Sequence, residues 1–129
     1  MEDKNYNAVD KHYELCQMLH IIYLAKNKSY GNSASDTFDE LGPISSVTRM
    51  FDKMKRIVHL TKMSNNDAVT LSTLKEVNES IEDALLDIAN YALMMLVDLD
   101  RVKRLNSVRE GHKCVSQAHE IEGKGQDNG

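Results

Sequence analysis

An aspartate and an asparagine interrupt a strongly apolar stretch of the chain, and two further acidic residues precede this stretch. Residues 84–97, ALLDIANYALMMLV, contain only Asp87 and Asn90 as polar residues. In a helix, where each residue advances by about 100°, Glu79 and Asp83 fall in the same stripe as these two. A buried carboxylate is costly unless it is ion-paired, hydrogen-bonded or bound to a cation. The stripe therefore needs a partner, either a Lys or Arg of a neighbouring helix in a structural network or a bound cation or ligand in a functional site.

A second stripe carries the opposite charge. Arg49, Asp52, Lys53 and Arg56 recur at the i, i+3, i+4, i+7 spacing that makes residues neighbours on one helix face. By itself such a stripe is typical of a solvated surface. Arginine donors suit phosphate, however, and Mg²⁺ commonly joins one or two carboxylates to substrate phosphates. If the two stripes face one cleft, they suit a nucleotide triphosphate.

Three helical segments are expected to position these stripes. Apolar residues recur at helical spacing over residues 7–25, over 43–60 after the favourable Gly42-Pro43 opening, and over 78–105. Polar and glycine-containing runs separate them, and we find no alternating strand pattern. The sequence predicts an all-α fold, a small bundle of three or more helices, with the third helix buried on most of its circumference.

Length and composition are those of one ordinary globular domain. The chain has 129 residues, of which 41% are hydrophobic and 28% charged, and its formal net charge is −4. We expect residues 1–105 to form the domain and the polar residues 106–129 to form a weakly ordered tail. The mixed-sign charge disfavours binding to a nucleic-acid polymer.

Cysteine content and hydropathy indicate a cytoplasmic protein. Cys16 and Cys114 are too few and too far apart to indicate a disulfide framework. The polar, acidic start does not resemble a signal peptide, and no apolar run is long enough to span a bilayer. We therefore expect no contact with a membrane.

Several spaced blocks of the sequence resemble the phage-enriched nucleotide modification associated domain of the first type. The blocks are KNKSYGN at residues 26–32, then Gly42, then RMFDKMKRIVHL at 49–60, and ESIEDALLDIANYAL at 79–93. The last block is also similar to the second acidic helix of MazG-type all-α nucleoside-triphosphate pyrophosphohydrolases. In that comparison Glu79 and Asp83 match a metal-binding pair, and Asn90 matches a following asparagine.

These resemblances imply a site for a free nucleotide or a nucleotide-derived small molecule. The residues expected to bind it are Lys26, Asn27, Tyr30, Arg49, Lys53, Arg56 and Asn90, with Glu79, Asp83 and Asp87 as candidate catalytic residues. Tyr30 is suited to stacking on a base and Lys26 to meeting a phosphate. The MazG-type pattern has a further acidic pair on the preceding helix, where this chain has only Asp52.

The sequence leaves three functions open. One is a Mg²⁺-dependent nucleotide pyrophosphohydrolase in phage nucleotide metabolism or base modification, acting in the host cytoplasm. Another is a protein that binds, and does not hydrolyse, a nucleotide-derived signal of host defence, which the missing acidic pair favours. The third is a helical interaction protein without a ligand. Because a few amphipathic segments do not fully cover one apolar helix, we also expect a homodimer or a higher homo-oligomer.

Overall fold

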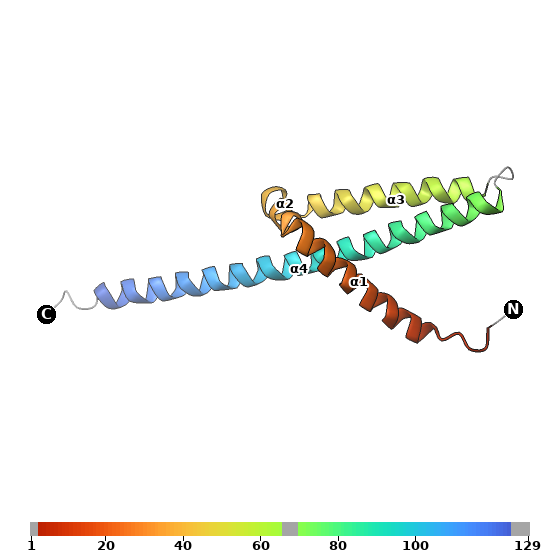
Figure 1. The fold of residues 1–129 in the computed structure, drawn as a ribbon. Coiled ribbons are helices and arrows are strands. Elements are labelled where there is room, and N and C mark those ends of the chain that lie inside the picture. The colour runs from red at the N-terminus through yellow and green to blue at the C-terminus, as the bar shows by residue number, and fades with distance from the viewer. Residues whose placement is uncertain (1–2, 66–69, 125–129) are drawn as a thin grey trace. The chain divides into compact units, whose positions relative to one another are not determined.

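All regular secondary structure in the described part of the chain is helical. The structure is a computed structural model that describes residues 3–65 and 70–124, with side chains described up to residue 112. It contains the helices α1 (Ala8–Tyr30), α2 (Ser33–Leu41), α3 (Ile44–Ser64) and α4 (Leu71–Lys124) (Figure 1). The prediction of an all-α fold is confirmed.

The contacts between residues divide the chain into two compact units. The first, Met1–Met95, contains α1, α2, α3 and the part of α4 up to Met95, and the second, Leu96–Gly129, contains the rest of α4. The first unit is a small all-α bundle in which α3 lies beside the start of α4 (Figure 1). The predicted division between a domain and a tail after residue 105 stays a prediction.

Side chains and glycines define the ends of the first helices. The Asn7 side chain accepts hydrogen bonds from the backbone N–H groups of Val9 and Asp10 and so caps the start of α1. Gly31 ends α1 with φ 63°, and Gly42 ends α2 with φ 78°. Because side chains disfavour this positive-φ region, glycine suits both positions. The chain therefore changes direction between α1 and α2 and again between α2 and α3.

Helix α2 is an element that the sequence analysis did not predict. It occupies Ser33–Leu41, within a run rich in Ser, Asn and Asp that is typical of a loop. The sequence pattern from which this helix could have been predicted is the i, i+4, i+7 spacing of Ala34, Phe38 and Leu41. Phe38 is buried, with 4% of its surface exposed, so tertiary packing supports the helix against its weak local propensity.

All three predicted helices continue past their expected ends. Helix α1 ends at Tyr30 and not near residue 25. Helix α3 starts beside Pro43, as predicted, but ends at Ser64 and not near residue 60. Helix α4 begins at Leu71, where the Thr70 hydroxyl accepts the N–H of Thr73, and continues to Lys124, beyond the end predicted at residue 105. A single internal glycine, Gly111, costs a helix only about 1 kcal/mol and so does not end it.

The apolar core of the protein is small. The buried apolar residues are Leu19, Phe38, Val77 and Ala84, and no described side chain has less than 2% of its surface exposed. The prediction that the apolar stretch of the third helix is buried on most sides is correct only in part: ten of residues 84–97 are buried or partly buried, whereas Leu85 and Leu93 are each 51% exposed. The other helices of the first unit leave this side of α4 uncovered.

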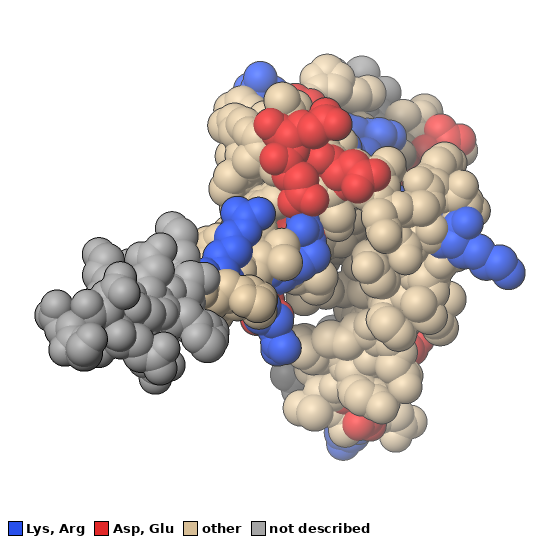
Figure 2. Space-filling model, turned by 90° about the vertical axis from the view of Figure 1, so that its left-hand side faces the viewer, with Lys and Arg blue, Asp and Glu red and all other residues tan. Residues whose placement is uncertain are grey.

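The surface carries charges of both signs. In the face drawn in Figure 2, one large group of acidic side chains lies near the top, smaller acidic groups lie apart from it, and Lys and Arg side chains occupy several separate places. Within the described residues, no helix is long and apolar enough to cross a membrane. Cys16 is exposed and is not in a disulfide, and the Cys114 side chain lies outside the described residues.

Candidate functional site

Asp87 of α4 lies between two lysines from two other helices. Lys53 Nζ of α3 lies 2.8 Å from Asp87 Oδ2, and Lys26 Nζ of α1 lies 3.4 Å from Asp87 Oδ1. Each carboxylate oxygen therefore has its own ammonium partner. Lys53 and Asp87 are partly buried, at 27% and 26% side-chain exposure, whereas Lys26 is 57% exposed. These two ion pairs connect α1 and α3 to α4.

The surroundings of Asp87 favour its charged form. Burial by itself raises the pKa of this carboxyl, but the hydrogen bond from Lys53 and the positive charges of Lys26 and Lys53 outweigh burial and lower the pKa below its ordinary value of 3.8. Asp87 is therefore ionised at neutral pH. As its oxygens already contact two ammonium groups, it is less available as a metal ligand than a free carboxylate is.

Arg49 adds a third cation near these lysines. Its guanidinium carbon lies 6.0 Å from the centre of the Tyr91 ring, which places a residue of α3 over a residue of α4. Arg49 is one turn before Lys53, and Tyr91 is one turn after Asp87. The two contacts therefore join adjacent turns of α3 and α4. We call Lys26, Arg49, Lys53 and Asp87 the lysine–arginine cluster.

Two members of the predicted acidic stripe lie in water. Glu79 and Asp83 are exposed, so the prediction that the whole stripe is at least partly buried is wrong for them. It is correct for Asp87, which is partly buried, and for Asn90, which is 7% exposed. Exposed carboxylates at these two positions avoid the cost of burial. Among the described residues, no three His, Cys, Asp or Glu side chains come together in a group that could hold a metal ion.

The other predicted binding residues are spread around the cluster. Tyr30 is 74% exposed at the end of α1, and Arg56 is exposed on α3. Asn27 is half-buried, and its backbone carbonyl accepts the Gly31 N–H at 2.8 Å. Asn90 is covered by its surroundings, so a ligand at the surface has little access to it.

The cluster has a net positive charge and unused hydrogen-bond donors. It contains three cations and one carboxylate, which contacts the two lysines, and each ammonium has three donors and the guanidinium five. Since Asp87 has only two oxygens, donors remain for an anion. Phosphate suits such a group because it offers several strongly accepting oxygens.

The sequence analysis did not predict two of these relationships. It left the partner of Asp87 open, and the structure shows the Lys partner of the structural alternative, supplied by α3 and also by α1. Tyr91 is not among the residues predicted to form the site. Arg49 lies one helical turn before Lys53, and Tyr91 lies one helical turn after Asp87. In two antiparallel helices this spacing predicts the Arg49–Tyr91 contact, but only once the Lys53–Asp87 pair is known.

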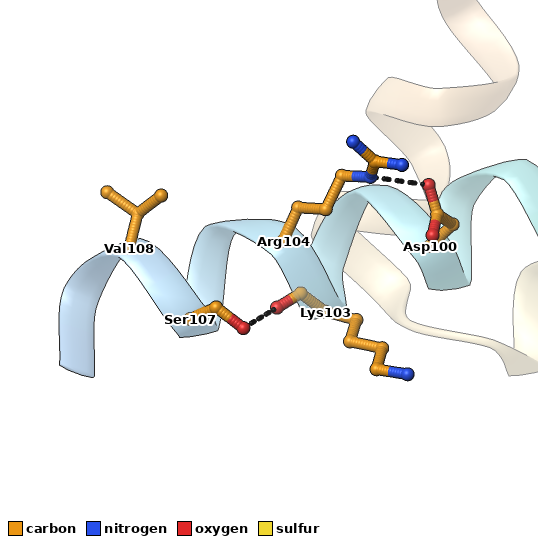
Figure 3. Close-up of a pocket in the computed structure, with 5 residues that line it drawn as sticks. All are labelled: Asp100, Lys103, Arg104, Ser107 and Val108. Carbon is orange, nitrogen blue, oxygen red and sulfur yellow. Dashed lines mark hydrogen bonds and ion pairs between the residues drawn. The ribbon is translucent and has the colours of Figure 1, made fainter. Parts of the chain in front are cut away.

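A shallow depression in the second unit has a different character. It is lined by five residues of α4 alone, namely Asp100, Lys103, Arg104, Ser107 and Val108 (Figure 3). Arg104 Nε donates to Asp100 Oδ2 at 2.9 Å, and the Ser107 hydroxyl donates to the backbone carbonyl of Lys103 at 3.1 Å. Successive turns of one helix form an open surface, and the polar side chains of Asp100, Arg104 and Ser107 are already hydrogen-bonded within it. We assign no ligand to it.

Comparison with known proteins identifies one relationship. The model of the family described as Nucleotide modification associated domain 1 matches residues 26–99. The match begins at Lys26 of the lysine–arginine cluster and includes all of its members. The comparisons with curated proteins and with solved structures found no match.

Proposed function

Because the chain belongs to the Nucleotide modification associated domain 1 family, we propose that it binds a free nucleotide, or a nucleotide-derived small molecule, through its phosphate groups. The proposed site is the lysine–arginine cluster, and the proposed setting is the cytoplasm, which in a phage infection is that of the host. A nucleic-acid polymer is a poorer ligand, because the chain has a net charge of −4 and therefore lacks a broad positive field.

The observation that carries this proposal is the convergence of Lys26 and Lys53 on Asp87. Two ammonium groups at 3.4 and 2.8 Å from one carboxylate show that α1 and α3 direct cations to the same point of α4. Such a carboxylate holds the lysines in place while leaving an excess of positive charge for an incoming phosphate. Arg49 supplies a planar donor group on the adjacent turn of α3.

Tyr30 supports a nucleotide over inorganic phosphate. It follows Lys26 by four residues on α1, so the two side chains are neighbours on one helix face. Its ring is 74% exposed and is available to stack on a base. Stacking accepts every base, so we propose selectivity for the phosphate groups and for the presence of a base, and not for its identity.

Binding of a mixed nucleotide pool to the full chain, measured by native mass spectrometry with and without Mg²⁺, tests this proposal. Individual ligands are then titrated by calorimetry. Loss of a charge-assisted hydrogen bond costs about 1.5–3 kcal/mol, so Arg49→Ala and Lys53→Ala should weaken binding roughly ten- to a hundred-fold. Asp87→Asn should have the opposite sign, because it removes the negative charge that competes with phosphate.

Two ion-paired cations outside the cluster provide matched controls. Lys11 pairs with Glu14 at 3.2 Å, and Arg104 pairs with Asp100 at 2.9 Å. Lys11→Ala and Arg104→Ala should leave nucleotide affinity unchanged. If the wild-type chain binds nothing in a broad nucleotide panel, and if the cluster variants change only stability, the nucleotide proposal fails and the helical interaction protein without a ligand replaces it.

A second candidate function is Mg²⁺-dependent hydrolysis of the bound nucleotide. It is favoured by the exposure of Glu79 and Asp83, which share one face of α4 four residues apart. Such carboxylates suit Mg²⁺, which binds one or two carboxylates together with substrate phosphates and which polarises a phosphate or a water molecule. The pairing of Asp87 with two lysines supports the other alternative, in which the protein retains a nucleotide signal of host defence without hydrolysing it.

A further inference from the structure

Helix α3 has a partly exposed apolar stripe on a side turned away from α4. Its members are spaced by three and four residues in alternation, with exposed fractions of 61% for Ile44, 43% for Val47, 59% for Phe51, 49% for Met54 and 47% for Val58. Leu41, at the end of α2, is also 64% exposed. Alternating spacings of three and four keep residues on one side of a helix and are typical of helix pairing.

This apolar stripe is separate from the face that α3 presents to α4. Lys53 and Arg49 contact α4, and they are partly buried together with Ile57 and Leu60. At about 100° per residue, the apolar stripe lies roughly a third of a turn away from these residues. Packing of α3 on α4 therefore leaves the stripe exposed.

The first unit lacks the apolar burial that normally stabilises a domain. Four apolar residues are buried in the described chain, whereas the five members of the α3 stripe remain about half exposed. Each would bury on the order of 100 Å², so two stripes together would bury on the order of 1,000 Å², the lower end for a specific interface. Contact between two stripes alone is thus below the roughly 1,200–2,000 Å² of stable complexes and suits a dimer that forms only at higher protein concentration.

We propose that the α3 stripe binds the α3 stripe of a second copy of this chain, with the two helices antiparallel. In this arrangement Phe51 packs against Met54 of the second copy, and Val47 packs against Val58 of the second copy. Every contact then occurs twice about a two-fold axis, which makes the interface self-complementary. The stripe extends over about 21 Å of helix at 1.5 Å per residue.

The charges at the two ends of α3 select the antiparallel direction. Helix α2 lies at the N-terminal end of α3 and exposes Asp36 and Glu40 (Figure 1). Near the other end, α3 exposes Lys62. Antiparallel pairing brings the acidic end of each copy to the basic end of the other, whereas parallel pairing would bring like charges together. Lys55 Nζ already lies 4.6 Å from the centre of the Phe51 ring, at the edge of the stripe.

Sedimentation of the full chain over a range of concentrations tests the dimer. The expected mass at tens of micromolar is twice the chain mass of 14.6 kDa. Phe51→Glu and, as a second disruption, Met54→Lys should raise the dimer dissociation constant by at least about 30-fold, because central apolar anchors contribute most to an interface. Tyr13→Glu is the matched control, since Tyr13 is 65% exposed on α1 and should not affect the dimer.

Charge exchange tests the direction of the helices. Glu40→Lys alone and Lys62→Glu alone should each weaken the dimer, and the two substitutions in one chain should restore it. Circular dichroism should show unchanged helicity, because all of these positions are exposed. A wild-type monomer, equal disruption by Tyr13→Glu, or failure of the double exchange to restore the dimer would overturn the proposal. Binding of the monomer to anionic vesicles through Phe51 would also overturn it and would assign the stripe to a membrane surface.

The dimer and the nucleotide site are independent in this experiment. Phe51 and Met54 lie outside the lysine–arginine cluster, so their variants should bind nucleotides as the wild type does. Failure of the dimer proposal would therefore appear in the sedimentation data alone, and failure of the nucleotide proposal in the binding data alone.

Discussion

Lys53 Nζ lies 2.8 Å from Asp87 Oδ2 and connects the middle of α3 to the apolar part of α4. This contact joins the two stripes that the sequence shows separately, the basic stripe of α3 and the acidic stripe of α4. Both side chains are about three-quarters covered, so solvent screens the pair less than it screens an exposed pair. The pair therefore serves as a structural contact and as the base of the proposed phosphate site.

Substitution of both partners should reveal a favourable coupling between them. In a double-mutant cycle of Lys53→Met and Asp87→Asn, urea unfolding should give a coupling energy of about 1 kcal/mol, as expected for a partly buried, charged hydrogen bond. The same cycle at Lys11 and Glu14, which are exposed and 3.2 Å apart, should give a smaller value. Equal coupling energies at the two sites would mean that Lys53 and Asp87 interact only as a solvated surface pair.

Acid should weaken the protein through Asp87. The pKa of Asp87 is lowered in the folded state, because the hydrogen bond from Lys53 and the charge of Lys26 outweigh the opposing effect of burial. The unfolded chain then binds this proton more readily, so the contribution of Asp87 to stability is complete above about pH 3.8 and is lost as the pH falls through the lower, folded-state pKa. Unfolding free energies measured against pH should fall there for the wild type.

The Asp87→Asn variant is the reference for that measurement. It lacks the titrating group, so its stability should change less with pH over the same acidic range. Parallel curves for the two proteins would contradict the assignment of a lowered pKa to Asp87. The ordinary loss of stability from other carboxylates is shared by both proteins and cancels in the difference.

The helical class and the main polar stripes are predictable from the sequence because both depend on local periodicity. Apolar spacing predicts α1, α3 and α4, and the Gly42-Pro43 pair predicts the start of α3. Helix α2 was missed because its propensity is weak and the burial of Phe38, a tertiary effect, stabilises it. The end of α4 was placed too early because a polar composition indicates exposure and does not by itself end a helix.

The partners of each charge could not be predicted from the sequence. Lys26 and Asp87 are 61 residues apart, and only the packing of α1 against α4 brings them together. Likewise, an apolar helix segment predicts burial only if enough other surface exists to cover it. The exposed Leu85 and Leu93 show that this chain does not supply that surface in the first unit.

The choice between hydrolysis and binding depends on Asp83. Its carboxylate is exposed on the same face of α4 as that of Glu79, one turn away, so Asp83→Asn removes one hard anionic ligand and leaves the fold unchanged. If the protein hydrolyses a nucleotide with Mg²⁺, this variant should lose phosphate or pyrophosphate release while it still binds the nucleotide, because the cations of the lysine–arginine cluster remain. If the protein only binds, the wild type should release neither product from any nucleoside triphosphate, and chelation of Mg²⁺ should hardly change its affinity.

The matched control is Glu82→Gln, which neutralises an exposed carboxylate adjacent in sequence but on a different side of the helix. Turnover that survives Asp83→Asn, or that Glu82→Gln reduces to the same degree, would exclude Asp83 as a specific metal ligand.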